Sequence, residues 1–260
     1  MKQITFILLL SLSFVLGACN AFLDITPQSD YTVEEGYKKE SDFEQAISAV
    51  YGKQQLLYNT NSCWFMYINH RSDDSRNANN VGRFVDSPNE SIWTTSWKTY
   101  WSIIDRCNLI LDKIDNAEFT NEERRDYIKG EAYMLRAYAY WSLGWQWGGV
   151  PLITKTTPLA EIRKIPRSTQ EVTLGQAISD YKEAIRLLPE EWGTNDIGRA
   201  TRYAAAGMLG RLYMFQNNFE DARTYLKMVV DQESVRYEME KKYEDCFIDS
   251  KDNGKERVWE

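Results

Sequence analysis

The sequence is poor in the residues that hold metal ions and carry most acid–base catalysis. His70 is the only histidine among 260 residues, and the four cysteines include no Cys-x-x-Cys pair. A histidine-based triad would have to use this single imidazole, and a zinc site would find neither a second imidazole nor a closely spaced pair of thiols. Glycine-rich phosphate loops, nucleophile elbows and His-Glu-x-x-His motifs are missing too. We therefore expect no catalytic residues, no metal and no cofactor.

Positive charge is also scarce. Lys and Arg number 31 against 38 Asp and Glu, which gives a net charge of −7. Nucleic acids and anionic membrane surfaces attract proteins through basic patches, so neither is an expected electrostatic partner. Aromatic residues, in contrast, make up 13% of the chain, with nine Trp and sixteen Tyr. We assign most of these rings to the core and a share of them to exposed stacking platforms.

The first residues have the pattern of a targeting segment. Lys2 precedes an apolar run over residues 4–16, which is too short to span a bilayer comfortably and ends in Leu-Gly-Ala-Cys at Cys19. This ending resembles the bacterial lipobox, where a signal peptide is cleaved before a cysteine that carries acyl chains such as palmitate. We predict a lipoprotein signal peptide over residues 1–18 and a lipid anchor on Cys19. An ordinary secretory signal is the alternative.

Apolar residues recur every three or four positions in several segments, a period typical of helices. In the segment from residue 121 to residue 147, apolar residues cover most of the helix circumference, so this helix must be packed on several sides. Thr120 and Glu123 form a capping box at its start, and Gly148 and Gly149 followed by Pro151 end it. Two further boxes, Ser41 with Glu44 and Ser168 with Glu171, indicate other helix starts. The helices expected before residue 190 cover about 41–57, 93–114, 121–147 and 168–188.

A helical hairpin follows these segments. Leu209, Gly210 and Tyr213 share one helix, Asn217 and Asn218 make the turn, and Ala222, Leu226 and Val229 share the next. This spacing resembles the tetratricopeptide pattern, in which small residues let two helices approach closely. The pattern as a whole predicts an all-α fold.

Several blocks of the chain resemble the SusD/RagB family. They are Gly130-Glu131-Ala132, Leu135-Arg136-Ala137, the run from Trp147 to Ile153, Trp97 with Tyr100, Asn108 and Ile114-Asp115, and Arg167 with Asp180. The resemblance implies tetratricopeptide-like hairpins stacked into a right-handed superhelical scaffold with long loops and little strand. It also implies an outer-membrane lipoprotein, exposed on the cell surface, that binds a nutrient, usually a glycan, for a SusC-like TonB-dependent transporter.

The expected organisation has three parts. Residues 1–18 are the signal peptide, 19–40 an extended tether, and 41–260 the SusD-like helical domain. The last residues, Glu256 to Glu260, resemble a family block that opens a strand and precedes a large second half. We therefore expect that the chain is truncated at its C-terminus.

The candidate ligand contacts come from a long polar stretch between residues 59 and 88. A long loop inside a compact domain is usually functional or disordered, and in the resembled family a loop in this neighbourhood contributes to the ligand surface. A solvated loop without a function is the alternative. The residues proposed to contact an oligosaccharide are Trp64, Asp73, Asp74, Arg76, Asn77, Arg83 and Phe84.

Two alternatives to a binding lipoprotein are kept open. One is an all-α glycan-active hydrolase or lyase, which needs two carboxylates across a cleft. The other is a tetratricopeptide-type lipoprotein that scaffolds other proteins. Glu131 and Arg136 are interpreted as structural side chains of the central helix. Cys63, Cys107 and Cys246 allow one disulfide at most, with its pairing open.

Overall fold

The computed structural model describes residues 36–58, 69–72, 80–248 and 254–259. The chain divides into an N-terminal unit, Met1–Gly36, and a body, Tyr37–Glu260, and the account below concerns the body. Over the described residues, its secondary structure consists of seven α-helices, three short 3₁₀ helices and two isolated β-bridges, without a strand. The predicted all-α class is confirmed.

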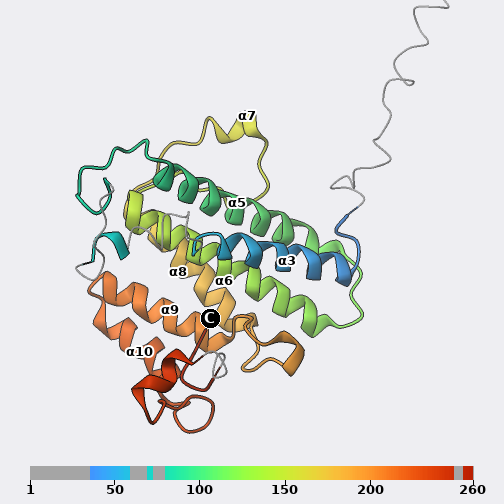
Figure 1. Cartoon of the computed structure of the whole chain (residues 1–260). Helices are drawn as coiled ribbons and strands as arrows, with labels where there is room; N and C mark the ends of the chain where they lie inside the picture. The colour runs from blue at the N-terminus through green and yellow to red at the C-terminus, as the bar shows by residue number, and fades with distance from the viewer. Residues whose placement is uncertain (1–35, 59–68, 73–79, 249–253, 260) are drawn as a thin grey trace, which may run out of the picture. The chain divides into compact units, whose positions relative to one another are not determined.

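Helix α6, Glu122–Trp147, is the centre of the body and packs against α3, α5 and α8 (Figure 1). It begins where the sequence predicted, but the predicted capping box is wrong. The Asn121 side chain caps the helix by accepting bonds from the backbone N–H groups of Glu123 and Arg124. Thr120 instead donates its backbone N–H and its hydroxyl to Glu40. The helix ends at Gly148, whose φ of 77° suits a glycine.

Helices α3, Glu40–Gln55, and α5, Ser91–Lys113, cover one side of α6. The short helix η1, Ile114–Asn116, continues α5. The predicted Ser41/Glu44 box at the start of α3 is wrong, because Asp42 accepts the backbone N–H bonds of Lys38 and Lys39 there. Glu44 pairs with two arginines from distant segments, Arg124 and Arg199.

Helix α8, Gln170–Leu187, covers another side of α6, and Thr169 rather than Ser168 caps its start. Beyond it lies the predicted hairpin, α9, Arg202–Phe215, and α10, Phe219–Val230. Asn217 takes a φ of 58° in the turn, and the rings of Tyr213 and Tyr225 stack between the helices at 5.8 Å. The remaining elements are α7, Leu159–Ile162, η2, Thr194–Asp196, and η3, Tyr243–Phe247.

A buried polar network joins α5, α6 and α8. Arg136 donates two bonds of 2.8 Å to the carboxylate of Asp180, one of 2.7 Å to the Asn108 side chain and one of 2.9 Å to the Thr154 carbonyl. A paired, hydrogen-bonded charge is the form in which a buried guanidinium is tolerated. Three residues from separate motifs of the sequence, Asn108, Arg136 and Asp180, thus meet in one cluster.

Glu131 belongs to a different buried network. Its carboxylate accepts a 2.9 Å bond from the Tyr51 hydroxyl and lies 3.1 Å from Nε of Arg199. The Tyr51 hydroxyl accepts in turn from the backbone N–H of Ala200. Glu131 and Arg136 are therefore both structural, as predicted, and each has its own partners.

The segment after α10 contains no strand within its described residues. The strand expected from Glu256 onward is absent over residues 256–259, where Glu256 accepts bonds from Glu240 and from the Cys246 thiol. Cys107 and Cys246 both carry free thiols, and Cys63 lies outside the described residues. Among the described helices, none has both the length and the apolar character required to cross a bilayer.

Candidate functional site

Most of the sequence-predicted ligand residues lie outside the described residues: Trp64, Asp73, Asp74, Arg76 and Asn77, together with the lipidation candidate Cys19. The structure does describe Arg83 and Phe84, and both are exposed. Phe84 has a φ of 57°, and its ring lies 4.8 Å below the guanidinium of Arg71.

An open cavity of about 390 Å³ lies beside this loop. Its walls come from four places in the chain: residues 69–72, the loop before α5, the first turn of α5 and the last turn of α6. The residues that line it are Arg71, Asp86, Pro88, Trp93, Trp145, Gln146 and Trp147. Its volume falls in the range of small-ligand sites.

Asp86 fixes one wall of this tryptophan cavity. It accepts a 2.6 Å bond from Nη2 of Arg71 and a 2.8 Å bond from Nε1 of Trp93, and the Arg71 guanidinium lies 5.5 Å from the Trp93 ring centroid. Burial raises the pKa of Asp86, but the bonds from Arg71 and Trp93 outweigh it, and the pKa is below its usual value. Asp86 is therefore an anion that orients two neighbours.

The opposite wall is supported from behind by further aromatic rings. Trp147 meets Trp97 at 5.5 Å and Tyr100 at 6.1 Å between ring centroids, both edge to face, and Trp97 meets Trp101 at 5.7 Å. Gln146 donates to the Tyr100 hydroxyl at 3.2 Å. Edge-to-face packing of this kind fixes ring planes, so the wall is preformed.

The chain just after α6 is held by Arg167. Its Nε donates to the Gly149 carbonyl at 2.5 Å and its Nη2 to the Trp147 carbonyl at 2.6 Å. A side chain at Gly149 would place its Cβ 1.7 Å from the carbonyl oxygen of Ser168, which explains the glycine. The end of α6 and its two tryptophans are thereby fixed in place.

The cavity combines flat apolar rings with a few polar groups, which is the composition of a site for uncharged, ring-shaped ligands. The helices predicted over 93–114 and 121–147 contain Trp93, Trp145 and Trp147, but the sequence analysis did not predict that these three rings meet. The signal in the sequence is weak: all three tryptophans occur within one turn of a helix end, but this position does not show that their rings meet.

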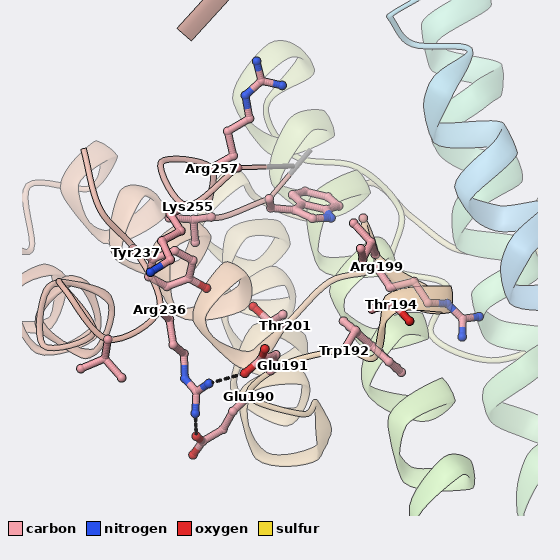
Figure 2. Close-up of a pocket in the computed structure, with 16 residues that line it drawn as sticks. Glu190, Glu191, Trp192, Thr194, Arg199, Thr201, Arg236, Tyr237, Lys255 and Arg257 are labelled. Atoms are coloured by element: carbon pink, nitrogen blue, oxygen red, sulfur yellow. Dashed lines mark hydrogen bonds and ion pairs between the residues drawn. The ribbon is translucent and has the colours of Figure 1, made fainter. Parts of the chain in front are cut away.

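Two other cavities fit a ligand less well. Figure 2 shows one of about 400 Å³, where the α8–α9 connection meets the C-terminal segment. There Arg236 pairs with Glu190 at 2.5 Å and with Glu191 at 2.7 Å, and Arg199 lies 5.3 Å from the Trp192 ring centroid. A second, of about 550 Å³, lies between α3 and residues 197–199. Since these charges mainly serve contacts within the chain, we favour the tryptophan cavity.

Comparison with known proteins identifies the family. Residues 21–214 match the SusD-like family described as "starch-binding associating with outer membrane". The chain is 27% identical over 273 residues to SusD-like protein P25 and 28% identical over 259 residues to SusD-like protein P38, both from Formosa agariphila. These matches cover 100% and 96% of the chain but 51% and 50% of the relatives. The chain thus spans about half the length of the curated relatives it matches.

Solved structures share the fold. A laminarin-binding SusD-like protein superposes with a TM-score of 0.75 over 86% of this chain and 51% of its own, at 21% identity. A SusD-like carbohydrate-binding protein from Bacteroides fragilis gives a TM-score of 0.74 over 86% of this chain and 46% of its own, also at 21% identity. Since the family profile matches residues 21–214 and the same fold recurs in these structures, the chain belongs to the SusD-like (SusD/RagB) family, as its motifs predicted.

Proposed function

We propose that this chain binds a glycan in the tryptophan cavity, without altering it, as part of an outer-membrane lipoprotein. The observation that carries the proposal is the meeting of Trp93, Trp145 and Trp147 around an open cavity of about 390 Å³. Indole faces stack on the C–H faces of sugar rings, and Arg71 and Gln146 can bond hydroxyls. The family description and the laminarin-binding neighbour support a carbohydrate as the ligand class.

The cavity is a poor candidate for glycoside hydrolysis. Such a site needs two carboxyl groups about 5–10 Å apart, one of them available to transfer a proton. Among the described residues that line the cavity, Asp86 alone carries a carboxylate. Its bonds to Arg71 and Trp93 and its lowered pKa make it an anion without a proton to give. Capture without turnover is the function that these side chains support.

Delivery of the captured glycan to a SusC-like TonB-dependent transporter is part of the same proposal. It is supported by the family description, which links starch binding to the outer membrane, and by the lipobox-like sequence before Cys19. The predicted domain organisation, with a signal peptide over 1–18 and a tether over 19–40, also stays part of this proposal.

Binding and turnover can be measured together. We would titrate the full chain with soluble starch and with laminarin by calorimetry, and follow the length of each glycan by chromatography. The expected result is saturable binding of at least one polysaccharide with its length unchanged. Trp93→Ala and Trp145→Ala should each weaken binding at least tenfold, about 1.4 kcal/mol, because each removes a stacking face.

The matched control is Tyr243→Ala, which removes an aromatic ring that is 81% exposed and does not line the cavity. It should bind as the unmodified chain does. If both tryptophan variants bind each glycan with the same affinity as the unmodified chain, the tryptophan cavity is not the binding site. Shortening of the glycan over time would instead support the enzyme alternative.

A further inference from the structure

The aromatic surface continues past the tryptophan cavity. Trp145 is 37% exposed, and its ring meets that of Phe215 at 6.3 Å between centroids with an interplanar angle of 90°. Phe215 is the last residue of α9 and is 44% exposed. A residue some seventy positions away in the sequence therefore extends one wall of the cavity toward the hairpin of α9 and α10, which lies at the lower left in Figure 1.

Packing of the hairpin does not explain this ring. The two helices are held together by the Tyr213–Tyr225 stack and by Gly210, where an added Cβ would lie 2.6 Å from the Leu226 side chain. These contacts are on the inner faces of α9 and α10. Phe215 faces outward and touches the wall of the cavity.

The neighbouring side chains of the turn are uncharged. Gln216, Asn217 and Asn218 follow Phe215, and Phe219, at the start of α10, is 64% exposed. Exposed apolar area of this kind often marks a binding surface. Aromatic rings flanked by amides match an uncharged polyhydroxyl ligand better than a nucleic acid or an anionic membrane.

We propose that Phe215 adds a stacking subsite to the tryptophan cavity, so that the protein holds an extended stretch of a long neutral polysaccharide. The inference rests on the proposed function, and it concerns the length of the ligand. A short oligosaccharide occupies the cavity alone. A longer chain continues over the edge formed by Trp145 and reaches the Phe215 ring.

The test is a length series of two probes, malto-oligosaccharides and laminari-oligosaccharides, with starch and laminarin as the long members. For the series that binds, the affinity of the unmodified chain should keep rising after the cavity is filled. Phe215→Ala should bind the shortest ligands normally and lose about tenfold in affinity for the polysaccharide. Phe215→Trp should retain the gain with length, because it keeps a flat ring.

Tyr243→Ala is again the control for loss of an exposed ring, and thermal unfolding of each variant checks the fold. Unchanged affinity of Phe215→Ala at every length would overturn the inference, as would an equal loss at every length. The inference would also be overturned if Phe215→Ala changed only the association of the chain with itself, since Phe215 would then belong to a protein–protein interface. In all three cases, weaker binding by Trp93→Ala or Trp145→Ala leaves the proposed function standing, whereas unchanged binding by both variants removes the tryptophan cavity as the binding site.

Discussion

At the scale of single residues, Asp86 has a role that its position beside the cavity does not suggest. A carboxylate beside a sugar-sized cavity would ordinarily be expected to bond ligand hydroxyls. Here its two oxygens already accept from Arg71 and from Trp93. We infer that Asp86 contributes to binding through the orientation of the Trp93 ring.

This role can be separated from direct contact. Asp86→Asn keeps an acceptor for the Trp93 indole and should weaken glycan binding only a few-fold. Asp86→Ala removes the acceptor and should weaken binding about tenfold, because the ring is then free to turn. In a Trp93→Phe background, which has no indole N–H, replacement of Asp86 by Ala should have little further effect. Calorimetric titration of the four variants gives the coupling, and additive losses would contradict the orienting role.

Glu131 gives the stability of the protein a pH dependence. Burial raises its pKa from 4.5 to about 8, although the bond from Tyr51 and the charge of Arg124 act in the opposite direction. The folded chain therefore holds this proton more tightly than the unfolded chain does. The contribution of Glu131 to the free energy of unfolding should be fully present below pH 4.5 and should fall as the pH rises toward about 8, by up to about 1.4 kcal/mol per pH unit.

Urea unfolding between pH 5 and pH 8 measures this dependence. The matched variant is Glu131→Gln, which keeps an oxygen acceptor for Tyr51 and has no proton to lose. The difference in unfolding free energy between the two proteins should shift in favour of the glutamine variant as the pH rises. A difference that stays constant would show that Glu131 is ionised throughout this range.

At the scale of secondary-structure elements, the α9–α10 hairpin depends on one small residue. An added Cβ on Gly210 would lie 2.6 Å from Cγ of Leu226 and 3.2 Å from its backbone nitrogen. Because the backbone cannot yield easily, Gly210→Ala should lower the free energy of unfolding by about 1–3 kcal/mol. Chemical denaturation measures the change.

Gly175 is the control for this prediction. It lies within α8, and an added Cβ would meet nothing within 4 Å. Gly175→Ala should leave stability unchanged or raise it by about 0.5–1 kcal/mol, because alanine restricts the unfolded chain more than glycine does. If both substitutions changed the free energy of unfolding equally, Gly210 would not be needed for the close approach of α9 and α10.

The elements themselves were largely predictable from the sequence. Apolar residues at helical spacing predicted the long helices α3, α5, α6, α8 and α9, and also α10. Each of these helices must bury an apolar stripe, and such a stripe can be recognised in the sequence. The caps were less predictable. Ser168 and Thr169 are adjacent and both suitable, and only the backbone geometry selects Thr169.

The candidate site was less predictable for a related reason. A tryptophan at helical spacing looks the same in the core and at a cavity, and Trp93 and Trp145 are separated by 52 positions along the chain. Their meeting depends on how α5 crosses α6, which local patterns do not encode. Arg83 and Phe84 were predicted to contact the ligand; the structure shows that both are exposed, and their contact with a ligand stays a prediction.

At the scale of the whole molecule, the proposed lipid anchor can be tested against the net charge of −7. An acidic body gains nothing from an anionic surface, so our proposal makes membrane attachment depend on the predicted lipid on Cys19. Cys19→Ser should therefore move the chain from the membrane fraction to the soluble fraction of cells that make it. Immunoblots of the two fractions measure this, and a serine variant that stays with the membrane would contradict the lipid anchor.

The Arg167 contacts described above have a consequence for any mutational survey of this surface. Arg167 grips the carbonyls of Trp147 and Gly149 and does not line the tryptophan cavity. Replacement of Arg167 would loosen the end of α6, and the rings of Trp145 and Trp147 would then be less well oriented for stacking. A screen that measures only glycan binding would then report Arg167 as a sugar contact, although its side chain acts indirectly by holding the backbone at the end of α6.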